Sequence, residues 1–343
     1  MLEGLIPNPR FALACVAAHP EGGRTGRDAA RALVALDAPD ADPTVRNALA
    51  DRVPVIEETL AALGWRWVAF TDPDFPVRLS AVSDPPLGLF VRGTLPTDHA
   101  VALVGARRAT SYGREVAEYL GRELALAGVA VVSGMARGVD GSAHRGALAA
   151  GGRTVAVWGA GPDRVYPPEH ADLAEEIARQ GCLVTEYPPG SPPLAHHFPE
   201  RNRLIAGLVE AVVVVEADER SGALITARLA LDEGRDVLAV PGSVFSRLSA
   251  GPNGLLRAGA APALSADDVL AALGLPPRTP TPGGEEPEII ALIPSGEGVT
   301  VDRLAAASGK PVAEVLEALL LLELAGRVAR EADGRFRRCH VHP

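Results

Sequence analysis

The chain has 343 residues, of which 47% are hydrophobic and 4% aromatic, and its formal net charge at pH 7 is −10. This length fits two or three domains of a globular protein. Neither an apolar run of about 18 residues nor a charged-then-apolar leader occurs, so we expect no membrane span, no signal peptide and a cytoplasmic location. The cysteines Cys15, Cys182 and Cys339 are far apart and odd in number, which argues against a disulfide framework. The acidic balance excludes a protein that coats nucleic acid through bulk charge.

The N-terminal residues 1–64 are rich in small apolar residues and predict a small helical domain. Three segments have helical patterns, LACVAAH (13–19), DAARALVAL (28–36) and TVRNALADRVPVIEETLAAL (44–63). We therefore expect a first domain boundary near residue 64.

Residues 65–274 alternate short β-branched apolar runs with helical patterns, which predicts an α/β domain with a parallel sheet buried on both faces. A helix-length segment, 223–232, joins the last two runs into a βαβ unit. Because ligands of open α/β sheets bind at the carboxyl ends of the strands, and several turns there contain arginine, we expect a site for an anionic ligand at that edge. The predicted strands are 101–104, 129–132, 154–157, 183–185, 211–215 and 236–240.

The turn after the first of these strands contains Gly105, Arg107 and Arg108. Two arginines directly after a strand and before a Thr-Ser-x-Gly turn are better explained by phosphate contact than by helix capping or surface ion pairs. We interpret all three residues as part of the anion site.

The start of the helix 223–232 is the second candidate position. Ser221 is the expected N-cap, with Gly222 beside it and Thr226 one turn on. Free backbone N–H groups and the positive end of the helix dipole suit an incoming phosphate.

The next two turns add cations and an aromatic ring. Gly134 and Arg137 follow the second strand, and the alternative interpretation of Arg137 is an ion pair with Asp140. Arg164 and Tyr166 follow the third strand. The tyrosine either stacks on a base or packs over the proline that follows it.

The segment FPERNRLIAG, 198–207, contains both aromatic and cationic candidates. Phe198 either stacks on a base or fills the domain interior, and Asn202 either contacts base edges or holds a loop. Arg201 and Arg203 are two residues apart, so on a helix they diverge by about 200° and only one can face the ligand. We expect the other to pair with a neighbouring carboxylate. The candidate carboxylates are Glu216 and Asp218.

The C-terminal part begins with the Pro/Gly-rich residues 275–287, which predict a linker. Residues 288–343 then predict three helices and a two-stranded wing. The third helix, 311–325, contains three glutamates and no Lys or Arg, and an acidic helix does not readily enter a groove lined with phosphates. We therefore expect a protein-contact or structural role, with the arginines of the wing as the alternative nucleic-acid contact. The glutamates are Glu314, Glu317 and Glu323.

Cofactor and metal motifs are weak. Cys339, His340 and His342 crowd the terminus without a spaced partner pair, so we expect no metal site. The glycines of VGARRATSYG do not form the G-x-G-x-x-G fingerprint, so we expect no nicotinamide cofactor.

Six motifs together resemble the DprA/Smf family, over roughly residues 72–270. Their order, spacing and number make the resemblance specific. The motifs are VGARRATSYG (104–113), SGMARGVDGSAH (133–144), GPDRVYPPEH (161–170), FPERNRLIAGL (198–208), SGALITA (221–227) and GRDVLAVPG (234–242).

The resemblance implies a protein that binds single-stranded DNA during natural transformation and promotes RecA loading and strand annealing. It implies an extended Rossmann-like core, an N-terminal SAM-like domain, a C-terminal winged-helix-like domain and a homodimer formed through the Rossmann-like domains. It places a DNA contact on Arg107. Family members often carry lysine where this chain has Pro168, and we expect Arg164 to supply that charge.

Two other functions use the same phosphate pocket. The segment RSGALITA after a strand ending near Glu216 loosely resembles nucleoside-monophosphate phosphoribohydrolases, but their PGGxGT loop is replaced by SGALIT. No general acid–base pair and no nucleophile beside a base is evident, so we expect a protein that is not an enzyme. A nucleotide-binding sensor is the third alternative. Release of free base would indicate the enzyme, and length-dependent single-strand binding would indicate the DNA-binding protein.

Overall fold

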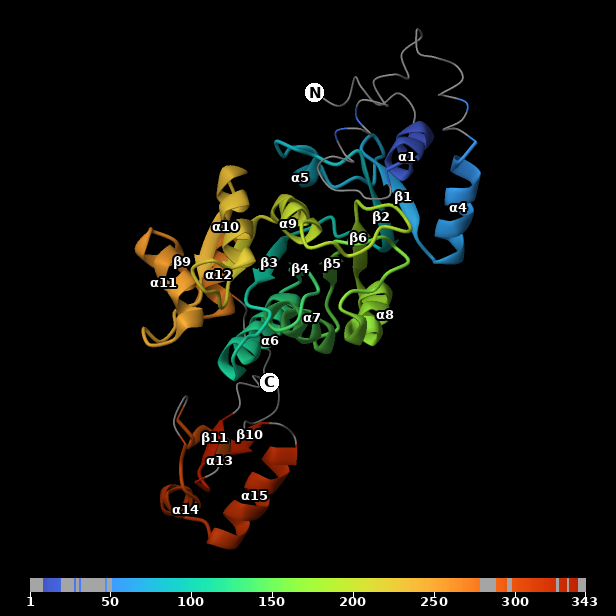
Figure 1. Cartoon of the computed structure of the whole chain (residues 1–343). Helices are drawn as coiled ribbons and strands as arrows, with labels where there is room; N and C mark the ends of the chain where they lie inside the picture. The colour runs from blue at the N-terminus through green and yellow to red at the C-terminus, as the bar shows by residue number, and fades with distance from the viewer. Residues whose placement is uncertain are drawn as a thin grey trace. The chain divides into compact units, whose positions relative to one another are not determined.

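The computed structural model describes residues 9–19, 28, 31, 47, 51–277, 288–294, 298–324, 327–331 and 333–338. The chain divides into two compact units, Met1–Pro277 (unit 1) and Arg278–Pro343 (unit 2) (Figure 1). The described N-terminal helices belong to unit 1, and a separate domain boundary near residue 64 stays a prediction.

Unit 1 is built on one sheet with the strand order β1-β2-β6-β5-β4-β3-β7-β8-β9. The strands from β6 to β9 in this order run parallel, and β1 and β2 pair antiparallel at one edge. All five residues of β3 are buried, as a strand covered on both faces requires. The bounds are β1 (Arg66–Ala69), β2 (Gly88–Gly93), β3 (Ala100–Val104), β4 (Ala130–Ser133), β5 (Thr154–Val157), β6 (Cys182–Thr185), β7 (Ala211–Val214), β8 (Asp236–Ala239) and β9 (Ala261–Pro262).

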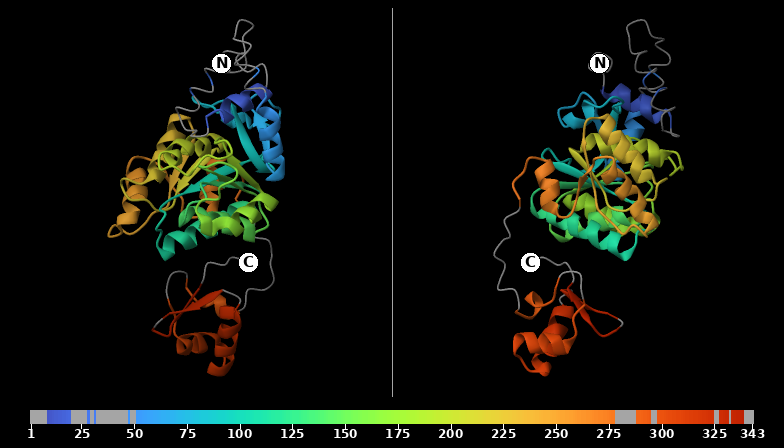
Figure 2. Two further views of the ribbon diagram at one scale, coloured as in Figure 1. Left: turned by 45° about the vertical axis from the view of Figure 1, so that its right-hand side comes forward. Right: turned by 90° about the vertical axis from the view of Figure 1, so that its left-hand side faces the viewer.

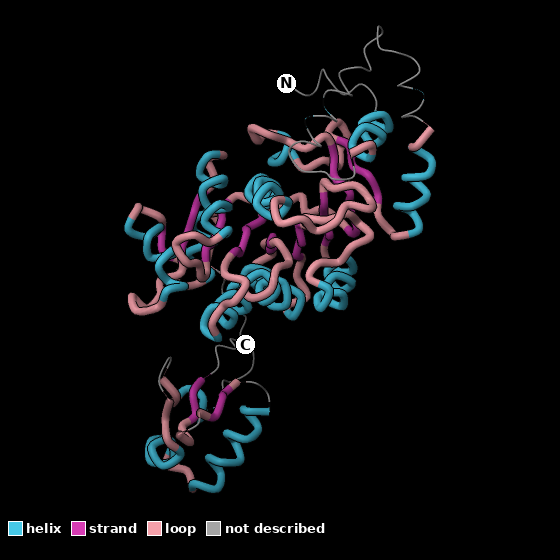
Figure 3. The backbone as a smooth tube through the Cα atoms, in the orientation of Figure 1, coloured by secondary structure: helices cyan, strands magenta, loops and turns pink. Residues whose placement is uncertain are grey.

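Helices cover both faces of this sheet (Figures 2 and 3). The helices α9 (His197–Leu208) and α10 (Gly222–Asp232) pack on one face, through a core that includes Leu204 and Ala227. The helices α6 (Ser111–Leu126), α7 (Val139–Ala149) and α12 (Ala266–Ala272) pack on the other. The remaining helices of unit 1 are α1 (Pro9–Ala17), α4 (Val53–Ala62), α5 (Val77–Ser80), η1 (Pro168–His170), α8 (Ala171–Gln180), η2 (Arg247–Ser249) and α11 (Ala250–Arg257).

The predicted strands are all present, each within one residue of its expected bounds, and the helix predicted at 223–232 begins one residue earlier. The prediction of an α/β core with a parallel sheet is confirmed. Sequence reasoning did not predict β1 and β9, which are the two edge strands of the sheet, or β2, which lies between β1 and β6. β1 begins with an exposed residue and both residues of β9 are exposed, so neither has the continuous apolar run that marks a strand buried on both faces.

Unit 2 contains α13 (Glu288–Ala291), α14 (Val301–Ser308), α15 (Val312–Leu324) and an antiparallel pair, β10 (Val328–Arg330) and β11 (Phe336–Arg338). Its core includes Ile290, Val315, Leu319 and Phe336. The three predicted helices and two-stranded wing are thus confirmed.

Some predicted features lie outside the described residues. These are most of the linker at 275–287, most of the helix at 28–36, and the terminal group Cys339, His340 and His342. Among the residues that the structure does describe, no helix has the length and apolar character needed to cross a membrane.

Candidate functional site

A pocket of about 230 Å³ lies where the strand order of unit 1 reverses, with β4 and β7 on either side of β3. This is the position at which open α/β sheets bind their ligands. The pocket is lined by the turn after β3, the loop after β4, one side of α9 and the N-terminus of α10. Of the predicted site residues, the pocket lining includes Gly105, Arg107, Phe198, Arg201, Asn202, Ser221, Gly222 and Thr226. Those that do not line it are Arg108, Gly134, Arg137, Arg164 and Tyr166.

Arg107, Phe198 and Tyr166 form a row of a cation and two rings. The guanidinium carbon of Arg107 lies 4.9 Å from the centre of the Phe198 ring, which in turn lies 5.3 Å from the centre of the Tyr166 ring. Phe198 is therefore half-buried beside the pocket rather than packed in the domain interior. Cations beside accessible aromatic rings are used by proteins that bind single-stranded nucleic acid, where the rings stack on bases.

Arg201 lies buried at the base of the pocket, with 4% of its surface exposed. Its Nη1 donates hydrogen bonds to the carbonyl oxygens of Val157 and, at 3.0 Å, of Gly134. Burial lowers the pKa of Arg201 to about 10, which still leaves the guanidinium charged at neutral pH. Asp140 is buried as well, and burial raises its pKa against the opposing effect of Arg201.

Gly134 has a structural reason to be glycine. A Cβ at this position would lie 2.5 Å from Nη2 of Arg201. Its N–H donates to Asp140 Oδ2 at 3.1 Å, and Ala136 N–H donates to the same oxygen at 3.3 Å. Gly134 therefore supports Arg201 and Asp140 from outside the pocket.

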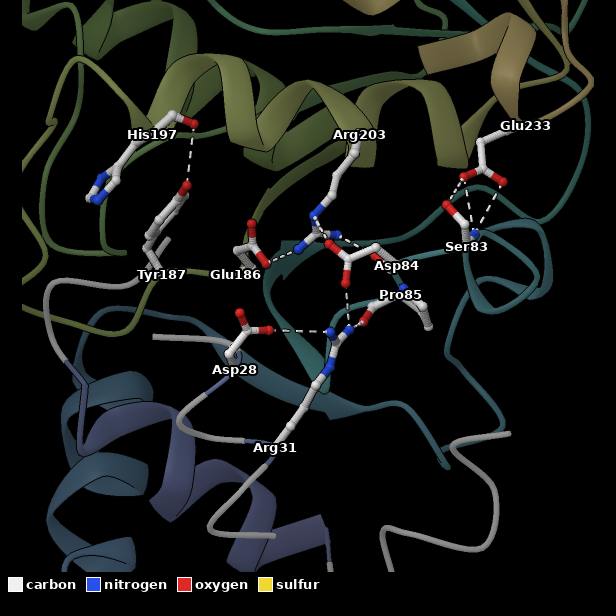
Figure 4. A network of polar contacts seen from close by, with 10 residues as sticks. All are labelled: Asp28, Arg31, Ser83, Asp84, Pro85, Glu186, Tyr187, His197, Arg203 and Glu233. Carbon is white, nitrogen blue, oxygen red and sulfur yellow. Dashed lines mark hydrogen bonds and ion pairs between the residues drawn. The ribbon is translucent and has the colours of Figure 1, made fainter. Parts of the chain in front are cut away.

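Arg203 pairs with other carboxylates than expected (Figure 4). The predicted partners Glu216 and Asp218 are wrong: Arg203 forms an ion pair with the buried Glu186, and its Nε lies 3.3 Å from Asp84 Oδ2. Asp84 also forms an ion pair with Arg31, with 2.7 Å between Oδ1 of Asp84 and Nη2 of Arg31. Arg201 is thus the arginine of this helix that faces the pocket, and Arg203 holds the opposite side of α9 in place.

Arg137 and Arg164 also have carboxylate partners. The expected alternative for Arg137, a bridge to Asp140, is wrong because Arg137 pairs with Glu169. The Nε of Arg164 lies 3.5 Å from Asp163 Oδ2. Both arginines are about half exposed, so these pairs contribute little to stability.

Two residues whose role sequence reasoning did not predict hold the turn that carries Arg107. Glu216, two residues beyond the end of β7, accepts hydrogen bonds from Thr110 N at 2.9 Å and from Thr110 Oγ1 at 2.6 Å. Its carbonyl oxygen accepts from Ala106 N at 2.6 Å. Thr110 in turn caps α6, with Gly113 N–H as donor. The T-x-x-G spacing of a capped helix was the available signal in the sequence, whereas the contact with Glu216 depends on strand order.

Carboxylates already lie at the N-terminal ends of α6 and α7. The carboxylate of Glu216 lies at the N-terminus of α6, and Asp140 lies in the first turn of α7. In contrast, α10 has no acidic residue in its first turn, and its predicted N-cap is confirmed because Ser221 Oγ accepts from Ala223 N at 3.3 Å. The N-terminus of α10 is therefore the one of these three that is suited to an external anion.

Comparison with known proteins identifies the family of this chain. Residues 66–274 match the family model of DNA recombination-mediator protein A, and residues 274–334 match the DprA winged helix domain. The chain belongs to the DprA family. This places it among proteins that process DNA in recombination, and it confirms both the Rossmann-like core and the winged helix.

Individual members of the DprA family are similar to this chain in sequence and in structure. The Smf protein of Escherichia coli is 42% identical over 78% of this chain and 76% of its own. The X-ray structure of DprA from Streptococcus pneumoniae is 34% identical, with a TM-score of 0.59 over 76% of this chain and 92% of that one. A structure of Helicobacter pylori DprA, described by its single-stranded DNA binding mode, is 30% identical, with a TM-score of 0.55 over 61% and 95% of the two chains.

Proposed function

We propose that this protein binds single-stranded DNA in the pocket between β3, β4, α9 and the N-terminus of α10. The observation that carries the proposal is the convergence of Arg107, the buried Arg201 and the anion-free N-terminus of α10 on one pocket at the point where the strand order reverses. A structure of Helicobacter pylori DprA with a single-stranded DNA binding mode supports it.

In this proposal the backbone phosphate docks on α10, where Ser221, Gly222 and Thr226 supply N–H and hydroxyl donors. Arg107 neutralises the phosphate charge, and the rings of Phe198 and Tyr166 stack with bases. Arg137 and Arg164 exchange their carboxylates for neighbouring phosphates. With a net charge of −10, binding stays local to this surface.

From family membership we extend the proposal to RecA loading and strand annealing by a cytoplasmic homodimer that is not an enzyme. The dimer would form through the Rossmann-like domains, and the N-terminal helices would be the SAM-like domain.

The rival functions are a nucleotide sensor and a phosphoribohydrolase. A hydrolase of this type needs a glutamate near the ribose, but Glu216, the residue that the motif suggests, is 2% exposed and is bonded to Thr110. This observation favours DNA binding over hydrolysis.

The test is a salt titration of binding to labelled oligo-dT and to a duplex of equal length. We expect a preference for the single strand that weakens steeply with salt. Arg107→Glu should weaken binding by about 2 kcal/mol or more, because it places a like charge in the pocket. Arg108→Glu is the matched control: it makes the same charge change in an exposed neighbour that does not line the pocket, so its effect should be smaller.

Equal losses in the two variants would show that general charge, and not the pocket, controls binding. No binding of oligo-dT at low salt would contradict the proposal, and nucleoside monophosphates would then be the ligands to measure.

A further inference from the structure

The helix α15 of unit 2 exposes large apolar side chains in water. Val312 is 45% exposed, Leu316 47%, Leu320 55% and Leu321 62%. An adjacent side of the same helix holds Val315, Leu319 and Leu322 in the core of unit 2. The apolar surface of the helix is therefore wider than the side that is needed to fold the domain.

Val312, Leu316 and Leu320 are spaced at i, i+4 and i+8, so they form one stripe along the helix. We call these three residues the α15 stripe. It is about 12 Å long, which matches two to three turns of a facing helix. Contiguous exposed apolar side chains of this kind mark interaction sites, whereas singly scattered ones do not.

The charges on the exposed part of α15 limit what can cover the stripe. Glu314, Glu317 and Glu323 are all exposed, and α15 contains no Lys, Arg or His. A nucleic-acid backbone would meet three like charges. A second copy of α15 would place carboxylates against carboxylates. Positive charge on the occupant, in contrast, would pair with these glutamates.

We propose that α15 is a protein-docking surface that takes a basic amphipathic helix of a partner protein. The leucines of that helix would pack on the α15 stripe at i, i+3/i+4 and i+7, and its lysines or arginines would pair with Glu317 and Glu323, which lie nearer to the stripe than Glu314 does. This role is separate from the pocket of unit 1.

The probe is a synthetic helical peptide with leucine at i, i+4 and i+7 and lysine at the flanking positions. A second peptide has glutamate in place of each lysine. Binding of both to the full-length protein is measured by fluorescence anisotropy. We expect the lysine peptide to bind at least about tenfold more tightly than the glutamate peptide.

Two variants separate a built surface from general attraction to an acidic protein. Leu316→Gln with Leu320→Gln removes the apolar anchors and keeps every charge, and should weaken binding of the lysine peptide by about tenfold. Leu231→Gln, on α10 of unit 1, is the matched control because Leu231 is 57% exposed; it should leave binding unchanged. An unchanged circular dichroism spectrum and melting temperature will show that the double variant is folded.

Equal binding by the parent and the folded double variant would overturn the proposal, since the peptide would then be responding to net charge alone. Failure of the lysine peptide to bind at millimolar concentration would overturn it too. Sedimentation that shows self-association of the parent, lost in the double variant, would assign the stripe to a second copy instead.

Discussion

Arg201 is a buried cation whose surroundings make it tolerable. The carbonyl oxygens of Gly134 and Val157 accept from it, and Asp140 supplies an opposite charge nearby. Replacing Arg201 by methionine leaves those oxygens without this donor and Asp140 without its cation. We expect Arg201→Met to lower the free energy of unfolding by about 3 kcal/mol in a urea titration.

Arg164→Met is the control for that measurement. Arg164 is half exposed and pairs with Asp163 at 3.5 Å, so its loss should cost no more than about 0.5 kcal/mol. If the two variants lose the same stability, Arg201 is not the structural cation that its contacts indicate.

His144 gives the stability a defined pH dependence. The hydroxyl hydrogen of Thr154 is donated to Val131 O. Its Oγ1 therefore accepts a hydrogen bond from Nδ1–H of His144, 2.6 Å away, and the imidazole ring is neutral. Burial lowers the pKa of His144 to about 3. An unfolded histidine has a pKa of about 6.5, so between pH 6.5 and pH 3 the unfolded chain binds a proton that the folded chain does not.

The contribution of neutral His144 is therefore complete above about pH 6.5 and is lost as the pH falls, by up to about 1.4 kcal/mol per pH unit. Urea titrations of the parent and of His144→Gln between pH 7 and pH 5 measure this. Titratable groups that both proteins share contribute equally to the pH dependence of their free energies of unfolding. We therefore expect the free energy of unfolding of the parent to fall more steeply as the pH is lowered. Parallel slopes would contradict a neutral, buried His144.

At the scale of elements, β7 positions the N-terminus of α6. The carboxylate of Glu216 binds the backbone and hydroxyl of Thr110, and Gly113 lies so close that a Cβ would overlap with the Glu216 side chain. Glu216→Gln replaces one acceptor oxygen with an N–H₂ group that faces a donor. We expect a loss of about 1–3 kcal/mol of stability and weaker oligo-dT binding, because the turn with Arg107 loses its anchor.

Glu219→Gln makes the same chemical change three residues on, at an exposed position. It should leave stability within about 0.5 kcal/mol of the parent in the same urea titration. A Glu216 variant as stable as this control would mean that α6 is held by its own cap alone.

For the whole molecule, the two units are expected to act separately. The acidic α15 lacks any residue suited to phosphate, and the pocket residues all belong to unit 1. Truncation after Pro282 should therefore leave oligo-dT affinity within about threefold of the full-length value in an anisotropy titration. A collapse in affinity would place a DNA contact in unit 2, most simply on the arginines of the wing.

The central strands and the helix starts could be predicted from the sequence because their signals are local. A strand that is covered on both faces needs a continuous apolar run, and residues 211–215 form such a run. The cap of α10 is equally local, because Ser221 Oγ accepts from the backbone N–H of Ala223, two residues on. The grouping of Arg107, Arg201 and Ser221 at one edge followed from the rule for parallel sheets and from motif order.

The ion-pair partners could not be predicted in this way. Whichever of Arg201 and Arg203 faces away from the ligand was expected to pair with Glu216 or Asp218. That residue is Arg203, and it binds Glu186 and Asp84, which are 17 and 119 residues away in sequence. Nor could the sequence show that Glu216 and Asp140 would occupy the ends of α6 and α7. Such contacts depend on which strands are neighbours and on how a helix is rotated about its axis, and these are decided only when the whole chain packs. The sequence by itself determined the elements and the edge at which the ligand site lies, whereas tertiary structure decided which charges remain for a ligand.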